Sequence, residues 1–397
     1  MIRHMKQREV FIAEAVRTPF GRYFGGLSNV RPDDLLGFTL SSLAKKLPNF
    51  DLNFIDDVII GDSNGAGEDN RNVARMGLLL ADFPKNIPGV TVNRLCGSGA
   101  ESIIQASRAI RSGDCNFIIA GGVESMSRAP WIVERTSKEQ PINPTYHQST
   151  VGWRMTNPLF PSLWTQRLGR CAEEVAERFN ISRQAQDEWA LRSHELADVA
   201  WSRNLHKDFV VPFNQIIKDE SIRADTSLKK LSELPSAFSE GGAGTAGNSS
   251  PINDGSVAML ITDNLGLEKL GVTGIGRIIG TQVTATTPNE FSLAPVSAIH
   301  KVLASTGKSI SDIKVWEINE AFASMVLSVL HEIPEIDQAK VNINGGAIAI
   351  GHPVGASAAR VVIDCATELR RQGGGIGIAA ACIGVGLGVA VAIEVEG

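Results

Sequence analysis

One stretch constrains the fold of this chain more than any other. Residues 92–100 form an apolar run that ends in a cysteine and a Gly-Ser-Gly turn, and residues 101–107 continue with small and apolar side chains at helical spacing. The pattern predicts a buried strand that turns directly into a buried helix, with Cys96 at the junction. Because unpaired N–H groups and the positive end of the helix dipole meet there, we expect the Cys96 thiol to ionise more readily than a free thiol, whose pKa is about 8.5. The alternative is a cysteine that only packs, since free cysteine is often buried.

The size and charge of the chain limit the class of protein it can be. Its 397 residues exceed one small core and indicate two or three structural units, and 43% hydrophobic with 20% charged residues is typical of a well-folded protein. The net charge of −5 argues against a nucleic-acid binder, so an anionic ligand needs a local cluster of basic groups.

The cysteines and the N-terminus indicate the compartment. The five cysteines form no C-x-x-C pair and no zinc spacing, which predicts reduced thiols, no metal site and a cytoplasmic protein. No apolar signal region follows the charged N-terminus, and no apolar run reaches the ~18 residues of a membrane span.

Strands and helices alternate along most of the chain, which predicts an α/β fold with a largely parallel sheet covered by helices. Strands are expected at 9–16, 54–60, 116–120, 254–260, 275–287 and 315–318, with helices beginning at residue 32 and at 72–80, 292–305 and 320–331. Residues 375–381 and 386–395 are expected to form a C-terminal hairpin. Residues 125–247 break the pattern with an irregular Trp- and Pro-rich segment and two helical runs, and are expected to lie over the first α/β unit.

Two parts of the chain resemble each other. The turn at 96–100 feeds a small-residue helix and then a buried strand, and the turn at 351–356 feeds a helix at 357–370 and then the strand from 375. The similarity suggests a duplicated unit.

Four reactive or polar side chains follow predicted core strands: Cys96, Asn319, His352 and Cys382. Ligands of α/β sheets bind beyond the carboxyl ends of strands, so these residues are candidates for one site. Glycines before His352 and a proline after it place this imidazole at a turn entering a helix, although a lone histidine is more often structural. The alternative role for Asn319 is a helix N-cap.

Five motifs, in order along nearly the whole chain, resemble those of thiolases: residues 92–99, 121–127, 319–322, 345–353 and 382–384. The resemblance implies the thiolase fold, with two similar βαβαβαββ halves, central helices between sheets and an inserted loop domain that binds coenzyme A (CoA). The implied units are residues 1–124 completed by 248–269, the inserted domain 125–247, and the C-terminal half 270–397.

The resemblance also implies the chemistry. Cys96 would take an acyl group from a CoA thioester, and His352 would deprotonate Cys96 and donate a hydrogen bond to the thioester oxygen of the second substrate. Cys382 would transfer the proton at the α-carbon of acetyl-CoA. Asn319 would hold a water in the oxyanion site, and the backbone N–H groups of Cys96 and Gly384 would form a second oxyanion hole.

CoA is implied as a substrate, with no permanently bound cofactor. The positions matching the family's CoA contacts are Arg223, Ala246, Ser250, Leu168, Ala321 and Phe322. Two departures affect this part, because Pro251 replaces the family's usual glycine and Leu168 stands where a methionine is common.

Residues 67–75 and 151–158 look most like thiolases that cleave 3-oxoadipyl-CoA, and Arg154 or Arg71 is a candidate to face the distal carboxylate of such a substrate. A homodimer or homotetramer is expected from the family. Two alternatives remain: a decarboxylating ketoacyl synthase, which uses Cys-His-His where this chain has Asn319 and Cys382, and a non-catalytic acyl-CoA-binding relative, which need not keep all four reactive groups.

Overall fold

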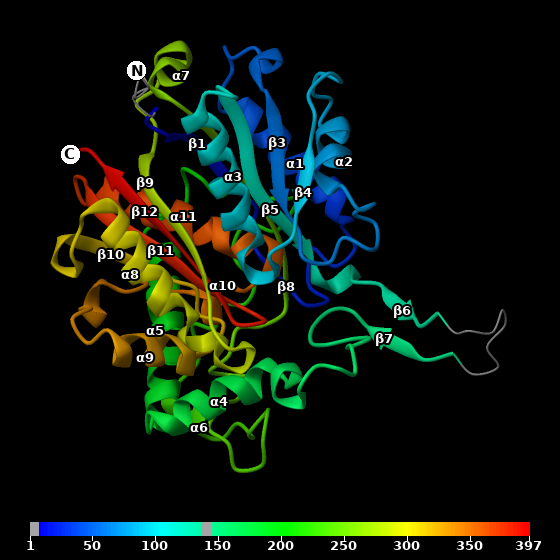
Figure 1. The fold of residues 1–397 in the computed structure, drawn as a ribbon, viewed down its shortest axis with the longest axis vertical. Helices are drawn as coiled ribbons and strands as arrows, with labels where there is room; N and C mark the ends of the chain where they lie inside the picture. The colour runs from blue at the N-terminus through cyan, green and yellow to red at the C-terminus, as the bar shows by residue number, and fades with distance from the viewer. Residues whose placement is uncertain (1–7, 136–143) are drawn as a thin grey trace.

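The computed structural model describes residues 8–135 and 144–397, and they build one mixed sheet of ten strands (Figure 1). Its order is β10 (Ile313–Ile318), β11 (Gly375–Ile383), β12 (Leu387–Val395), β9 (Gly276–Ala285), β1 (Phe11–Arg17), β8 (Asn253–Thr262), β5 (Phe117–Ser125), β3 (Asp57–Gly61) and β4 (Val90–Val92), with β2 (Gly21–Arg22) paired to β8. The N-terminal half contributes β1 to β5 and β8, and the C-terminal half contributes β9 to β12.

The two halves join through β1 and β9, which pair antiparallel at Phe11–Arg277 and Ile12–Gly276. The expected hairpin of β11 and β12 is confirmed. The expectation of a largely parallel sheet is wrong, because only β3–β4, β3–β5 and β10–β11 pair in parallel. Alternation of strands and helices shows that crossovers exist, but it does not reveal that β8 enters antiparallel between β1 and β5.

Two central helices lie between the half-sheets: α3 (Ser98–Ser112) and α11 (Val354–Arg371). They contact each other, and α11 contacts β11 of its own half and β5 of the other half. A core on their side of the sheet contains Ile104 and Ile363. Two further cores lie beneath the outer helices, which are α1 (Pro32–Lys45) and α2 (Val73–Leu80) in one half and α8 (Ala294–Thr306) and α9 (Ala323–Glu332) in the other. The predicted fold class is therefore confirmed.

The central helices approach closely because glycines line their contact. A Cβ added at Gly99 would lie 2.8 Å from the backbone nitrogen of Ala359, and one added at Gly355 would lie 2.4 Å from the carbonyl oxygen of Val123. A larger residue at Gly99 would separate α3 from α11, and one at Gly355 would separate α11 from β5. Cys96 lies two residues before α3 and His352 two residues before α11, so the helix contact brings their two turns together.

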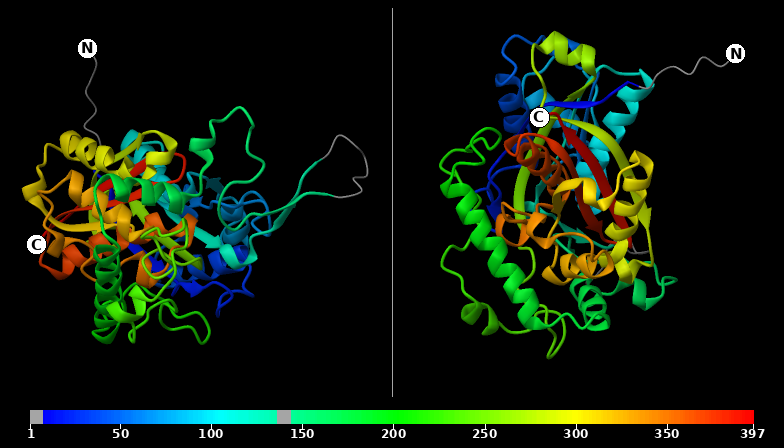
Figure 2. Two further views of the ribbon diagram at one scale, coloured as in Figure 1. Left: turned by 90° about the horizontal axis from the view of Figure 1, so that it is seen from below. Right: turned by 90° about the vertical axis from the view of Figure 1, so that its left-hand side faces the viewer.

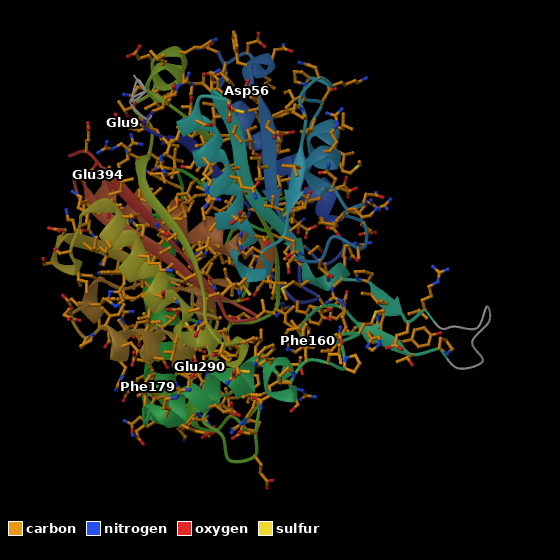
Figure 3. The ribbon with its side chains drawn as sticks, viewed as in Figure 1. Glu9, Asp56, Phe160, Phe179, Glu290 and Glu394 are labelled. Carbon is orange, nitrogen blue, oxygen red and sulfur yellow. The ribbon has the colours of Figure 1, made fainter. Side chains whose placement is uncertain are left out.

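The inserted segment packs mainly on the C-terminal half, so the expectation that it lies over the first unit is wrong for its helices. Helices α4 (Leu168–Arg178) and α5 (Arg183–Ser202) contact α9, and α5 also contacts α10 (Ala347–Ile350). Phe179, at the end of α4, stacks on His331 with ring centroids 4.3 Å apart, and Arg178 pairs with Glu290 at 2.7 Å (Figure 3).

Two other parts of the insertion lie away from the C-terminal half. A short hairpin of β6 (Trp131–Val133) and β7 (Tyr146–Gln148) projects from the body (Figures 1 and 2). The later part returns to the N-terminal half, where the buried carboxylate of Asp219 pairs with the buried guanidinium of Arg17 at 2.7 Å. The remaining helices are α6 (Leu228–Ser232) and α7 (Asn264–Leu270).

Most predicted elements lie within a few residues of the observed ones, with two informative exceptions. The strand before Cys96 is not buried, since β4 is a three-residue edge strand with Val90 40% exposed. The helix expected from Glu320 begins at Ala323, because the buried Glu320 carboxylate instead accepts hydrogen bonds from Trp189, Ser193, Asn342 and the Ile348 backbone. None of the helices in the described residues is long and apolar enough to cross a membrane.

Candidate active site

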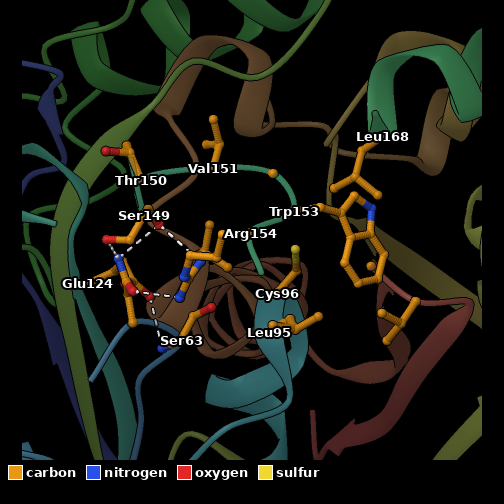
Figure 4. Close-up of a pocket in the computed structure, with 15 residues that line it drawn as sticks. Ser63, Leu95, Cys96, Glu124, Ser149, Thr150, Val151, Trp153, Arg154 and Leu168 are labelled. Atoms are coloured by element: carbon orange, nitrogen blue, oxygen red, sulfur yellow. Dashed lines mark hydrogen bonds between the residues drawn. The ribbon is translucent and has the colours of Figure 1, made fainter. Parts of the chain in front are cut away.

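A cavity of about 430 Å³ opens beside Cys96 (Figure 4). Cys96 enters it from the turn before α3, Gly384 from the loop after β11, Leu168 from the start of α4, and the loop 149–154 covers it. Four separate regions of the sequence therefore line one cavity beside the Cys96 sulfur.

The Cys96 thiol is neutral in the resting protein, contrary to the sequence-based expectation of easy ionisation. Cys96 is half-buried, and the surrounding protein raises the pKa of its thiol to about 11. The backbone N–H of Gly384 donates a hydrogen bond to the sulfur and lowers this pKa, but less than burial raises it. The start of a helix is therefore not enough to ionise this thiol, because desolvation disfavours the charged form more strongly.

Cys382 lies near the end of β11 and is 1% exposed. Burial raises the pKa of its thiol well above the usual range, and the charge of Cys96 raises it further. The two sulfurs are thus close enough to influence each other's ionisation, and the second thiol is also protonated at neutral pH.

The hydrogen bonds of His352 determine which of its nitrogens is free. Its Nδ1 lies 2.6 Å from Oγ of Ser357, and that hydroxyl donates its only proton to the carbonyl oxygen of Pro353 at 2.8 Å. Ser357 must therefore accept from Nδ1–H, which leaves Nε2 unprotonated. The Nε2 atom is buried and has no hydrogen-bond partner among the described residues. Burial, with a smaller contribution from Arg360, lowers the pKa of His352 to about 4, so the imidazole is neutral.

Asn319 lies directly after β10, and its backbone N–H donates to the carbonyl of Ala380 on β11 at 2.9 Å. The side chain is fully buried, and neither amide atom has a hydrogen-bond partner among the described residues. It does not cap a helix, since the N-cap of α9 is Phe322. Burying an amide whose N–H and C=O groups both lack hydrogen bonds costs free energy, unless the amide binds a ligand or a water molecule.

Most of the predicted CoA contacts gather on one side of the cavity. Ser250 donates from both its backbone nitrogen and its hydroxyl to the carbonyl of Ala321, each at 3.0 Å, and Ser249 bridges to Phe322. Leu168 packs in the same apolar core as Ala321 and Phe322 and also lines the Cys96 cavity.

Two predicted CoA contacts lie apart from that group. Ala246 is exposed on the loop that precedes Ser250. Arg223 is exposed on the insertion, where its backbone N–H donates to Nδ1 of His194 at 3.1 Å, and it does not line the Cys96 cavity.

Sequence reasoning missed Ser357 and Glu124. The carboxylate of Glu124 lines the cavity and accepts from the backbone nitrogens of Ser63 and Gly355 at 3.0 and 2.9 Å. Burial and the nearby Asp62 raise the pKa of Glu124 well above its usual range. Glu124 could have been identified from the sequence, because it is a carboxylic acid near the end of an otherwise apolar strand. Among the described residues, no group of side chains could hold a metal ion.

The two arginine candidates separate clearly. Arg154 lines the Cys96 cavity, whereas Arg71 is exposed and is not among the residues that line it. Only Arg154 can therefore contact an acyl group carried by Cys96.

Comparisons with known proteins identify the family of the chain. The family models "Thiolase, N-terminal domain" and "Thiolase, C-terminal domain" match residues 10–264 and 272–395. A 3-oxoadipyl-CoA/3-oxo-5,6-dehydrosuberyl-CoA thiolase of Escherichia coli K12 is 43% identical over 92% of this chain and 94% of that protein. A probable acetyl-CoA acyltransferase of Staphylococcus epidermidis is 36% identical over 91% of this chain and 92% of that protein.

Solved structures show the same similarity. The human mitochondrial 3-ketoacyl-CoA thiolase in complex with CoA has a TM-score of 0.92 and 34% identity, covering 98% of each chain. The Bacillus anthracis acetyl-CoA acetyltransferase has a TM-score of 0.90 and 35% identity, covering 98% of this chain and 99% of that one. Family models that together span nearly the whole chain, and relatives of this identity and coverage, lead to one conclusion: the chain belongs to the thiolase family.

Proposed function

We propose that this thiolase transfers an acyl group from a 3-oxoacyl-CoA to free CoA through an acyl-Cys96 intermediate, and runs the reverse condensation when product concentrations demand it. The observation that carries the proposal is that the turns before the two contacting central helices carry a neutral His352, whose buried Nε2 has no hydrogen-bond partner among the described residues, and a neutral Cys96 thiol. A neutral base can take a proton from a neutral thiol as the thiol attacks, so no thiolate has to be stored beforehand.

In the cleavage direction, the Cys96 sulfur attacks the 3-oxo carbon while His352 Nε2 accepts the thiol proton. The bond between C2 and C3 then breaks, and its electron pair forms the enolate of acetyl-CoA. Cys382 gives a proton to C2, which its raised pKa permits because the thiol is still protonated at neutral pH. Free CoA finally takes the acyl group from Cys96: the CoA thiol gives its proton to the Cys382 thiolate, and the departing Cys96 sulfur takes back the proton held by His352.

Two charge-stabilising sites complete the mechanism. Asn319, whose buried amide has no partner in the described part of the protein, would hold a water that acts with His352 on the oxygen of the enolate. The backbone N–H groups of Cys96 and Gly384 would bind the oxyanion formed at the acyl-enzyme, and the Gly384 N–H is already directed at the sulfur. In well-studied enzymes, losing one such donor costs about 3–4 kcal/mol of transition-state stabilisation.

The pantetheine arm of CoA would approach from the side of Leu168, because this residue belongs both to the cavity and to the core with Ala321 and Phe322. Ser250 borders the same approach through its hydrogen bonds to Ala321, and Ala246 lies farther out on the preceding loop. Arg223 lies farther out on the insertion, at a position suited to the nucleotide end of the ligand.

We further propose 3-oxoadipyl-CoA as the substrate, cleaved to acetyl-CoA and succinyl-CoA. Several relatives with this activity in their names are 40–43% identical to this chain. The reduced state of its five free cysteines supports a cytoplasmic protein. The exposed edge strand β4 supports assembly into a homodimer or homotetramer, because an unpaired strand edge invites a second copy.

The decisive experiment traps the intermediate. Purified protein mixed with 3-oxoadipyl-CoA, without free CoA, is expected to release one equivalent of acetyl-CoA and to retain a succinyl group on the peptide containing Cys96, detected by mass spectrometry. Cys96→Ala is the control and is expected to release none. Acetyl-CoA release by Cys96→Ala, or a succinyl group on another residue, would contradict the mechanism. A non-catalytic binding protein would form no acyl-enzyme at all.

A further inference from the structure

The cavity beside Cys96 contains a cation, Arg154, that forms no ion pair with any described residue. Its lining includes two residues of ionisable charge, Arg154 and Glu124, among otherwise neutral side chains and backbone. The guanidinium of Arg154 donates to the amide oxygen of Asn64 at 3.1 Å and to the carbonyl of Ser149 at 3.4 Å. Both acceptors are neutral, and no carboxylate in residues 8–135 and 144–397 forms an ion pair with it.

Glu124 does not serve as the counter-ion. One of its oxygens accepts from the backbone nitrogens of Ser63 and Gly355, it forms no ion pair with Arg154, and burial beside Asp62 raises its pKa, which disfavours the charged form. Arginine remains charged at every relevant pH. Arg154 is half-buried, and its permanent positive charge is held only by neutral acceptors. The other N–H groups of its guanidinium are therefore available to an anionic group of a ligand.

The position of Arg154 indicates which part of the ligand would carry the anionic group that it binds. Figure 4 shows Cys96 with Trp153 and Leu168 on one side and Arg154, Ser63 and Glu124 on the other. If CoA reaches the sulfur along Leu168, as proposed above, the acyl chain attached to Cys96 extends toward Arg154. The phosphates of CoA lie at the opposite end of that ligand and cannot be the anion concerned.

We propose that Arg154 is the specificity-determining residue that binds a terminal carboxylate on the acyl chain, an inference that rests on the proposed function. The preferred substrates would then be 3-oxoacyl-CoA esters of short dicarboxylic acids. When Cys96 attacks such a substrate and the C2–C3 bond breaks, the acetyl-CoA half leaves and the carboxylate remains on the acyl group bound to sulfur. Arg154 thus contacts the substrate and the acyl-enzyme alike, and Asn64 and Ser149 orient its guanidinium.

The test compares two substrates that differ only at the chain end: 3-oxoadipyl-CoA, and 3-oxohexanoyl-CoA, in which a methyl group replaces the carboxylate. The measured quantity is the ratio of kcat/KM values for the two substrates. Arg154→Gln is expected to lower this ratio by about 10- to 100-fold, the loss expected for a hydrogen bond to a charged group. Arg154→Lys keeps the charge and is expected to recover part of the ratio.

Arg71→Gln is the matched control, because it removes an arginine charge nearby in the sequence but outside the cavity. It is expected to leave the ratio unchanged. An Arg154→Gln variant that slows both substrates equally would show that Arg154 only supports the loop, and the inference would be wrong although the proposed substrate still stood.

A binding measurement separates this inference from the proposed function. In the Cys96→Ala background, calorimetry compares succinyl-CoA with its neutral analogue butyryl-CoA. A preference for succinyl-CoA that disappears with Arg154→Gln would support the carboxylate site even if the wild-type protein failed to cleave 3-oxoadipyl-CoA. Equal binding of the two ligands, with and without Arg154, would overturn the site even if cleavage were observed.

Discussion

At the scale of single residues, the state of His352 depends on a serine hydroxyl that the motifs do not identify. Ser357 follows His352 by five residues, and the first turns of α11 return its hydroxyl to the imidazole. Because the hydroxyl proton goes to the carbonyl of Pro353, the Nδ1–H tautomer is selected and Nε2 is available as the base. One hydrogen bond within a helix therefore sets both the orientation and the protonation of the imidazole.

We predict that Ser357→Ala lowers kcat by about 10- to 100-fold with little change in KM, since a misoriented catalytic group costs rate rather than ground-state binding. Steady-state kinetics of cleavage measures both constants. Ser328→Ala is the matched control, because this fully buried serine also donates to the carbonyl four residues earlier, at 2.7 Å, but lies on α9 away from His352. Equal losses in the two variants would show that the Ser357 effect is structural only.

At the scale of elements, the site depends on two helices that begin side by side. The N-terminal turns of α3 and α11 approach closely because Gly99 has no side chain, and Gly355 in turn lets α11 approach β5. Cys96 and His352 lie two residues before these two helices. The cysteine and the histidine thus keep their relative positions through a helix contact rather than through a loop.

We predict that Gly99→Ala lowers the free energy of unfolding by about 1–3 kcal/mol and also lowers kcat, because the added methyl group would press against the backbone of α11. Thermal unfolding and steady-state kinetics would measure the two effects. For comparison, a Cβ added at Gly37 in α1 would lie 3.1 Å from Cβ of Leu80 and 3.3 Å from the carbonyl oxygen of Gly77, both farther than the 2.8 Å contact at Gly99. Gly37→Ala is therefore expected to lose less stability and to keep kcat, and equal losses in the two variants would remove the special role of the central contact.

At the scale of the whole molecule, three carboxyl groups meet where the two halves join. Asp62 follows β3, Glu124 lies on β5, and Glu124 binds the backbone of Gly355 at the start of α11 in the other half. Burial, followed by the nearby Asp69, raises the pKa of Asp62 to about 8, and burial raises the pKa of Asp69 to about 6. These groups are therefore neutral in the folded protein at mildly acidic pH.

This arrangement predicts a stability that falls as pH rises. The folded-state pKa values of Asp62 and Asp69 exceed the ordinary value of about 3.9, so their contribution is complete below about pH 4 and is lost as pH rises through 6 and then 8. Asp62→Asn cannot ionise, and it is expected to flatten the decline of the unfolding midpoint between pH 6 and pH 9.

The control for that measurement is Asp225→Asn. Asp225 is exposed, and its hydrogen bond with Lys230 lowers its pKa, so it cannot produce a loss of stability at alkaline pH. Scanning calorimetry across this pH range gives the midpoints. A wild-type midpoint that rises from pH 6 to pH 9 would contradict the predicted sign.

Much of the fold and the set of candidate residues could be predicted from local sequence. Alternating apolar patterns, the proline and acids that begin α1, and Ser182 as the cap of α5 depend on neighbouring residues only, and the structure confirms these elements. The glycine-flanked Cys96 and His352 turns were equally local signals. Local sequence could not predict the order of the strands or the packing of the inserted helices on the C-terminal half. Both depend on contacts between segments far apart in the chain.

The sequence by itself determined the family, the motifs and the reactive side chains, since these depend on residue identity. The tertiary structure alone decided their chemical states. Cys96 lies at the start of a helix, which favours a thiolate, yet the protein around it raises its pKa to about 11. Arg154 and Arg71 were both candidates from the sequence, and only the tertiary structure separated them, because Arg154 lines the cavity and Arg71 does not. Desolvation and hydrogen bonding are sums over everything that surrounds an atom, and those surroundings exist only once the chain has folded.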